Sequence, residues 1–195
     1  GSMSVSGHSS QKHKPARKGV VYLPYPNPYR PQFEGNLSDK ILSDLDELFA
    51  TSCPPNEVAA VFIEPIQSDG GVIVPPTGFL KALEKKCKAN GILVVVDEAY
   101  SEFAGQSVAE KTTQHDNLVV LRSMSKWAGI AGLRVGYGLM NPLITKYILD
   151  IKQPYNVTEA GEIALLESLA DAEYLMHNVD LIVRERKRLF SSLQK

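Results

Sequence analysis

The chain places Lys126 in a loop of small residues and hydroxyls, within the run RSMSKWAGIAGLRVG over 122–136. Ser123 and Ser125 carry hydroxyl groups on one side of the lysine, and Arg134 follows it by eight positions. Hydroxyl groups and a guanidinium fork bind a phosphate dianion well. A deprotonated lysine amine attacks carbonyl groups. The loop therefore predicts a site that holds a phosphate close to a reactive carbonyl.

A second set of polar residues follows a strongly apolar run. The run ILVVV over 92–96 leads directly into Asp97, and Tyr100 lies three residues further on. Pyridoxal phosphate (PLP) needs an amine for its aldehyde, an acid beside its ring nitrogen and donors for its phosphate and ring hydroxyl. The sequence therefore predicts a PLP site in which Lys126 forms the Schiff base. Asp97 would pair with the pyridinium nitrogen, and Tyr100 would reach the ring hydroxyl.

Each of these residues also has a simpler interpretation. Lys126 can be an ordinary surface lysine, Asp97 can cap the turn after its strand, and Tyr100 can pack half-buried. The hydroxyls and Arg134 can serve turn geometry and a surface ion pair. The small residues around Lys126 favour the cofactor, because a bulky ligand must approach the backbone there. Taken one at a time, these residues leave the alternatives open.

Apolar runs of strand length alternate along the chain with segments of helical spacing. This alternation predicts an α/β fold with three layers, α/β/α, around a mostly parallel sheet. Ligands of such sheets sit beyond the carboxyl ends of the strands, so Glu64, Asp97 and Ser123 are expected on one rim. Asn36 or Ser38 is expected to cap the first helix and Thr77 the second. Strands are expected at 20–23, 58–63, 92–96, 118–121 and 135–140, and helices at 38–51, 77–89, 142–152, 158–169 and 172–194.

Composition places the chain among soluble globular proteins. Of its 195 residues, 44% are hydrophobic and 22% are charged, and the net charge of −1 gives no reason to expect nucleic acid or a membrane as partner. Cys53 and Cys87 are isolated and are expected as reduced thiols in a cytoplasmic protein. No metal site is expected. Residues 1–18 are expected to be a disordered leader with a tag remnant, and 19–195 a single partial domain.

Residues 97–190 resemble the histidinol-phosphate aminotransferases, a group of fold-type-I PLP enzymes. The resemblance rests on DEAYSEF at 97–103, SMSK at 123–126, GIAGLRVGYG at 129–138 and KQPYNV at 152–157. It implies a catalytic role for Lys126, Asp97 and Tyr100. By the same resemblance, Ala99, Ser123, Ser125 and Arg134 join these three in binding the cofactor, and Tyr155 and Asn156 lie near the substrate.

Residues 19–97 are similar to a different branch, the class III aminotransferases that include 4-aminobutyrate and ornithine enzymes. This similarity rests on YLPYPNPYR at 22–30 and FIEPIQSDGGVIVPP at 62–76. The two resemblances meet at 96–98, so we expect a chimera, natural or engineered. Class III enzymes usually carry glutamine where Tyr100 stands. The histidinol-phosphate group usually carries an asparagine on the loop at 64–67.

The resemblance implies transfer of an amino group from an amino donor to a 2-oxo acid, through a lysine Schiff base. It implies a histidinol-phosphate substrate, a place in histidine biosynthesis and a cytoplasmic homodimer. We expect the family's phosphate loop before residue 19 and its small domain after Lys195 to be absent, which would impair turnover. The alternative is a non-catalytic chimeric or truncated domain that binds PLP weakly or not at all. A nucleotide-binding module is disfavoured, because the glycines at 129, 132, 136 and 138 do not form a dinucleotide or P-loop fingerprint.

Overall fold

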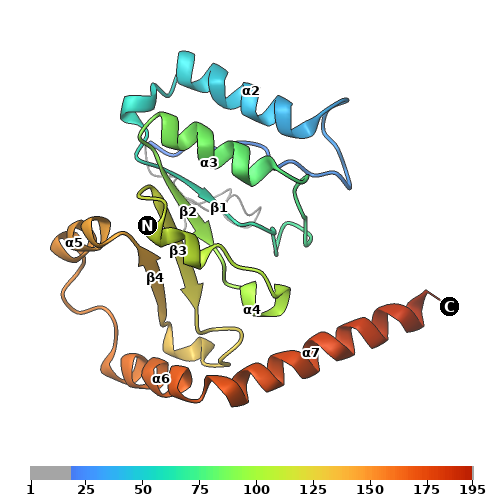
Figure 1. Ribbon diagram of the computed structural model, residues 1–195, viewed down its shortest axis with the longest axis vertical. Helices are drawn as coiled ribbons and strands as arrows, with labels where there is room; N and C mark the ends of the chain where they lie inside the picture. Colours follow the sequence, from blue (N-terminus) through green and yellow to red (C-terminus); the bar gives the residue numbers. More distant parts are fainter. Residues whose placement is uncertain (1–18, 195) are drawn as a thin grey trace. The chain divides into compact units, whose positions relative to one another are not determined.

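The chain forms two compact units in the computed structural model, Gly1–Val96 and Asp97–Lys195, and Figure 1 shows their elements. The structure describes residues 19–194, and the leader expected at 1–18 lies outside them. The boundary between the units falls where the two sequence resemblances meet. All the predicted cofactor and substrate residues belong to the second unit.

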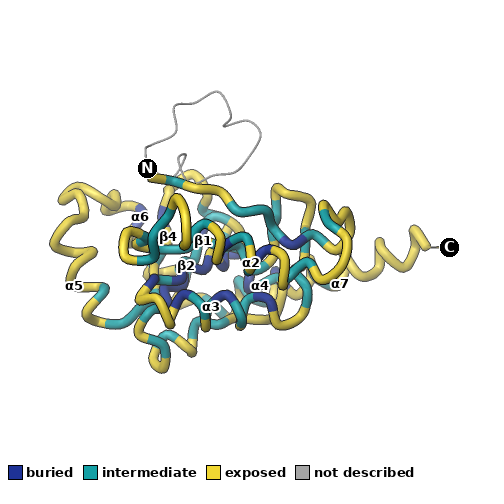
Figure 2. The backbone as a smooth tube through the Cα atoms, turned by 90° about the horizontal axis from the view of Figure 1, so that it is seen from above, coloured by how far each residue is buried: buried dark blue, intermediate teal, exposed yellow. Residues whose placement is uncertain are grey.

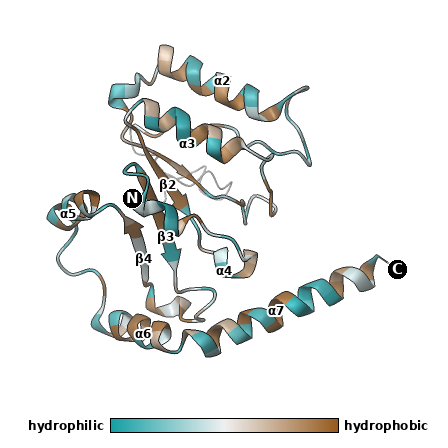
Figure 3. Ribbon diagram, viewed as in Figure 1, coloured by the Kyte–Doolittle hydropathy of each residue, from teal (hydrophilic) through white to brown (hydrophobic). Residues whose placement is uncertain are grey.

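The first unit is a parallel strand pair with helices. Strands β1 (Ala60–Ile63) and β2 (Leu93–Asp97) pair in parallel, from Ala60 opposite Leu93 to Ile63 opposite Val96. Parallel neighbours need a crossover connection, and α3 (Phe79–Ala89) lies in it. Hydrophobic residues run along β2 (Figure 3), where three consecutive valines at 94–96 are buried. The last residue of β2, Asp97, opens the second unit.

Helix α2 (Leu37–Ala50) begins as the sequence predicts. The Asn36 side chain accepts hydrogen bonds from the backbone N–H groups of Ser38 (3.0 Å) and Asp39 (3.3 Å). It therefore satisfies two of the N–H groups that a helix start leaves without partners. Buried Ile41 and Leu45 have the spacing of one helical face. The predicted cap at Asn36 is confirmed.

Two local predictions for the first unit are wrong. Helix α3 begins after Gly78, which has a φ of 89° and makes no side-chain cap, so Thr77 is not the N-cap. Glycine adopts this left-handed backbone without the steric cost that a side chain brings. Residues 20–23 form no strand. Prolines follow at 24, 26 and 28, and a proline has no N–H to donate to a strand partner.

Up to residue 194, the second unit combines an antiparallel strand pair with four α-helices. Strand β3 (Leu118–Ser123) pairs with β4 (Gly136–Met140), and Ser123 lies opposite Gly136. The sequence did not predict that this pair is antiparallel. The helices are α4 (Ser101–Ala104), α5 (Pro142–Ile151), α6 (Glu159–Ala170) and α7 (Ala172–Leu193). Short 3₁₀ helices occur at Pro55–Glu57, Ala109–Thr113 and Ala131–Leu133.

The core of the second unit lies behind the lysine loop. Met124, Trp127, Val135 and Val179 form one buried cluster, with Met124 fully inaccessible. Val179 comes from α7, so this helix closes the cluster, whereas α5 has no buried residue (Figure 2). Trp127 therefore serves as a packing residue of this core. Within residues 19–194, no helix has both the length and the apolar character needed to cross a bilayer.

Candidate functional site

The loop that carries Lys126 connects β3 to the 3₁₀ helix before β4. Met124 and Trp127 are buried on either side of the lysine, and the backbone N–H of Met124 donates to the carbonyl of Val135 (3.2 Å). These buried anchors fix the loop while the Lys126 side chain stays exposed. The packing pattern therefore presents the lysine to solvent from a rigid base.

The predicted phosphate donors lie together on this loop. The Oγ of Ser123 accepts a hydrogen bond from the backbone N–H of Ser125 (3.1 Å). Nη1 of Arg134 donates to the Oγ of Ser125 (3.5 Å) and to the carbonyl of Ala131 (2.8 Å). Arg134 has a φ of 53°, a left-handed backbone that costs free energy for a residue with a side chain. Two half-buried hydroxyls and one exposed guanidinium thus form a donor group with positive charge.

Asp97 and Tyr100 lie at the end of β2. The Oδ1 of Asp97 accepts a hydrogen bond from the backbone N–H of Ala99 (3.0 Å), so the aspartate caps the turn as the simpler interpretation held. The Nζ of Lys126 lies 5.5 Å from the centroid of the Tyr100 ring, within the range of a cation–π contact. The structure therefore brings Lys126 and Tyr100 together, although they are 26 residues apart in sequence.

Tyr155 and Asn156 lie in the loop between α5 and α6. Tyr155 is 90% exposed, and the carbonyl of Asn156 accepts a hydrogen bond from Nζ of Lys152 (3.4 Å). Among residues 19–194, neither side chain makes a hydrogen bond or ring contact with the lysine loop. The structure does not bring these two residues to Lys126, and their contact with a substrate stays a prediction.

Sequence reasoning missed a buried ion-pair network beside the site. Arg122 forms ion pairs with Glu98 (3.1 Å) and Glu102 (2.6 Å), and its Nη2 donates to the Oγ of Ser107 (2.7 Å). Burial raises the pKa of Tyr137, which lies opposite Arg122 on β4; Arg122 opposes this shift and Glu102 adds to it. The signals in the sequence were Arg122, which directly follows the apolar run at 118–121, and Glu98, which Asp97 separates from the apolar run at 92–96.

The family model described as "Aminotransferase class I and II" matches residues 20–195. The chain belongs to this family. The histidinol-phosphate aminotransferase of Dehalococcoides mccartyi (strain CBDB1) is 48% identical over 105 residues, which are 54% of this chain and 29% of the relative. The chloroplastic histidinol-phosphate aminotransferase 1 of Arabidopsis thaliana is 41% identical over 178 residues, 91% of this chain and 38% of the relative.

Solved transaminases share the fold of this aminotransferase-family chain. The histidinol-phosphate aminotransferase from Clostridium acetobutylicum matches with a TM-score of 0.65 and 24% identity, over 83% of this chain and 47% of that one. A PLP-bound amine transaminase from an uncultivated Pseudomonas species matches with a TM-score of 0.68 and 24% identity, over 92% and 42%. The predicted fold class, an α/β fold with a mostly parallel sheet like that of fold-type-I PLP enzymes, is confirmed.

The chain spans only part of the length of its curated relatives, from 29% to 38% of the first examples. The Arabidopsis alignment covers 91% of the chain and so includes residues on both sides of the boundary near residue 97. Both units therefore lie within the aminotransferase family. A junction between two branches of that family stays a prediction.

Proposed function

We propose that this chain binds PLP and takes part in the transfer of an amino group from an amino donor to a 2-oxo acid. One observation supports the proposal: in the second unit, the Lys126 amine lies close to the ring of Tyr100, which comes from the turn after Asp97. The Lys126 amine lies 5.5 Å from the Tyr100 ring, on the same loop as the donor group of Ser123, Ser125 and Arg134.

The chemistry of this donor set fits PLP. Ser123, Ser125 and Arg134 offer hydroxyl and guanidinium donors to a phosphate dianion. Lys126 would hold the cofactor through its aldehyde, and the Asp97 carboxylate would pair with the ring nitrogen. Bound PLP supplies a protonated ring that withdraws electrons from the substrate. The contacts at Tyr100 and Ala99 would come from the same turn as Asp97.

The residues of the chain would perform distinct tasks in that reaction. The Asp97 carboxylate would keep a proton on the ring nitrogen, because a nearby negative charge stabilises a positive one. Tyr100 would donate to the ring hydroxyl, and the Nζ of Lys126 would move a proton at the substrate carbon. Tyr155 and Asn156 would then contact the substrate.

We further propose a histidinol-phosphate type of substrate and a role in histidine biosynthesis. The support is 48% identity over 105 residues with one histidinol-phosphate aminotransferase and 41% over 178 residues with another. A cytoplasmic location and a homodimer are part of this proposal. The plant relative is described as chloroplastic, and that description belongs to the relative.

The second candidate is a domain that folds but binds PLP weakly or does not turn over. The exposure of Lys126, Asp97 and Arg134 favours it. A lysine attacks a carbonyl only when deprotonated, and a desolvated or electropositive setting promotes that state. An exposed lysine in water lacks most of this effect.

A half-reaction separates the two candidates. The chain is loaded with PLP, freed of excess cofactor and incubated with L-histidinol phosphate or 4-aminobutyrate, and pyridoxamine phosphate is measured by chromatography. The first proposal expects product with histidinol phosphate, no product from Lys126→Ala and normal product from the control Lys146→Ala on exposed α5. Bound PLP without product from either donor would support the second candidate. Product from Lys126→Ala would refute the role of this lysine.

A further inference from the structure

Arg122 lies at the point where the two segments of the candidate site meet. It directly precedes Ser123 in β3, and Glu98 directly follows Asp97. The ion pair between Nη2 of Arg122 and Oε2 of Glu98 (3.1 Å) therefore joins the neighbours of two predicted cofactor residues. A second ion pair, from Nη1 to Oε1 of Glu102 (2.6 Å), lies two residues beyond Tyr100. One guanidinium thus holds the chain on both sides of Tyr100.

Glu98 is the most deeply buried member of this network. Its side chain is 3% exposed, and both of its carboxylate oxygens accept hydrogen bonds. Oε1 accepts from the backbone N–H of Val108 (2.7 Å), and Oε2 accepts from the Oγ of Ser107 (2.8 Å). The backbone N–H of Glu98 donates to the carbonyl of Leu121 in β3 (2.9 Å). Glu98 therefore ties the turn after β2 to β3 through both its backbone and its side chain.

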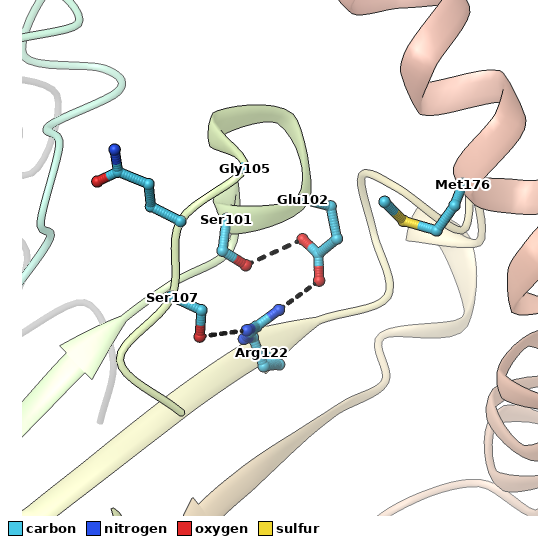
Figure 4. A pocket seen from close by; sticks show the side chains of 7 residues that line it. Ser101, Glu102, Gly105, Ser107, Arg122 and Met176 are labelled. Atoms are coloured by element: carbon cyan, nitrogen blue, oxygen red, sulfur yellow. Dashed lines mark hydrogen bonds and ion pairs between the residues drawn. The ribbon is translucent and has the colours of Figure 1, made fainter. Parts of the chain in front are cut away.

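The Arg122 guanidinium joins these acids with little freedom. Its side chain is 12% exposed and contacts Glu98, Glu102 and the Oγ of Ser107, as Figure 4 shows for the last two. A shallow, open pocket of about 200 Å³ lies beside it and is lined in part by Glu102, Arg122 and Met176. A guanidinium has a planar fork that binds two acceptors at fixed angles, which a lysine ammonium does not reproduce. The geometry of the network therefore depends on the arginine as well as on its charge.

We propose that Arg122 is a positioning residue that fixes the Asp97–Tyr100 turn against the Ser123–Lys126 loop through Glu98 and Glu102. The contact between Lys126 and Tyr100 is the consequence of this arrangement, because each lies on one of the two segments that Arg122 joins. The effect of Arg122 on PLP binding rests on the proposed function. The restraint that Arg122 places on the two segments is independent of that function.

The mechanical link is tested in the cofactor-free chain by hydrogen–deuterium exchange. Arg122→Lys keeps the charge and loses the fork, and Glu102→Gln keeps the shape and loses one charge. We expect both variants to raise exchange by about tenfold in the segments 98–108 and 123–126 together. If Arg122→Lys does not fold, Glu102→Gln carries the test. Both segments should respond, since one residue restrains both.

Asn141→Ala is the matched control for general destabilisation in the same unit. The Oδ1 of Asn141 caps α5 by accepting a hydrogen bond from the backbone N–H of Leu143 (2.8 Å), and its Nδ2 donates to the Oδ1 of Asp116 (2.8 Å). Neither contact involves a residue of the Arg122 network. This variant lowers stability and should leave exchange in both segments close to that of the wild type. If the network variants change exchange in neither segment, or only to the extent that the control does, the proposal is overturned.

PLP affinity provides the second readout. Titration of the wild type, Arg122→Lys and Asn141→Ala with PLP should show a dissociation constant raised about tenfold in the arginine variant alone. Equal affinity in Arg122→Lys and the wild type would overturn the positioning role for the cofactor. A wild type that binds no PLP would count against the proposed function, while the exchange result would still decide whether Arg122 joins the two segments.

Discussion

Replacement of Gly136 by alanine should disturb the start of β4 next to the candidate site. A Cβ atom at position 136 would lie 2.4 Å from the carbonyl oxygen of Arg122, and 3.5 Å from both its carbonyl carbon and the Cα of Ser123. All three atoms belong to the backbone, so no side-chain rotation can relieve the contact. Because Ser123 pairs with Gly136, the strand end that carries a predicted phosphate donor must move.

The size of this effect follows from the distance. Real Cβ atoms essentially never lie closer than 3.0 Å to another heavy atom, and this one would lie 2.4 Å from the oxygen. Strands β3 and β4 must therefore separate by at least 0.6 Å at this point. Overpacking of this kind costs about 1–3 kcal/mol. For a chain of this size, each kcal/mol lowers the melting temperature by about 2–4 °C, so the expected decrease is about 2–12 °C.

Gly138→Ala is the matched control on the same strand. Its Cβ would lie 2.6 Å from the Cε of Met140, the far end of a flexible side chain, and 3.7 Å or more from its other neighbours. The methionine can move, so we expect a melting temperature close to that of the wild type. Thermal unfolding followed by circular dichroism compares the two variants. An equal effect of both substitutions, or none from Gly136→Ala, would refute the close approach of β4 to β3 at Ser123.

Three further predictions concern the first unit. Asn36→Ala should lower the free energy of unfolding by about 0.5–2 kcal/mol in urea, because α2 loses its N-cap; an unchanged midpoint would contradict the cap. Burial and the charge of Glu64 raise the pKa of Tyr25, whose hydroxyl donates to the carbonyls of Glu64 (3.0 Å) and Pro65 (3.1 Å). The folded state thus holds the Tyr25 hydroxyl proton more tightly than the unfolded state does, so the free energy of unfolding should fall as the pH rises above 10.0. In Tyr25→Phe, which has no hydroxyl, this fall should be smaller. Burial raises the pKa of Cys87 from 9.0 to about 11, so the stability that the protonated Cys87 thiol contributes to the folded state should be lost as the pH rises from 9.0 to about 11. At about pH 8, a thiol reagent should modify half-buried Cys53 and should not modify buried Cys87 until urea unfolds the chain.

Helices and strands with strong local signals could be predicted from the sequence. Asn36 stands directly before a helix with apolar residues at helical spacing, and the structure confirms its cap. Thr77 has the same chemical capacity, yet Gly78 follows it and opens α3 in a left-handed conformation. A cap depends on the backbone angle of one residue, and the residue type alone does not determine that angle.

In the candidate site, too, the contacts within one loop could be predicted from the sequence, and the contact between distant segments could not. Ser123, Ser125, Lys126 and Arg134 lie within twelve positions, and the local chain brings these hydroxyls and the guanidinium together. The pairing of Arg122 with Glu98 joins residues 24 positions apart and depends on how two strand ends meet. Periodicity predicts which residues are buried in strands, and it does not predict the alignment that places one charged side chain against another.

The attachment point of PLP tests the central claim most directly. The chain is incubated with PLP, reduced with borohydride and digested with trypsin, which cleaves after unmodified lysine and arginine. Cofactor on Lys126 blocks cleavage there, so we predict a labelled peptide over 123–134 in place of separate peptides over 123–126 and 127–134. Lys126→Arg should lose this label, and Lys146→Ala should keep it. Label spread over other exposed lysines, with Lys126 unmodified, would contradict the assignment of this loop as the PLP site.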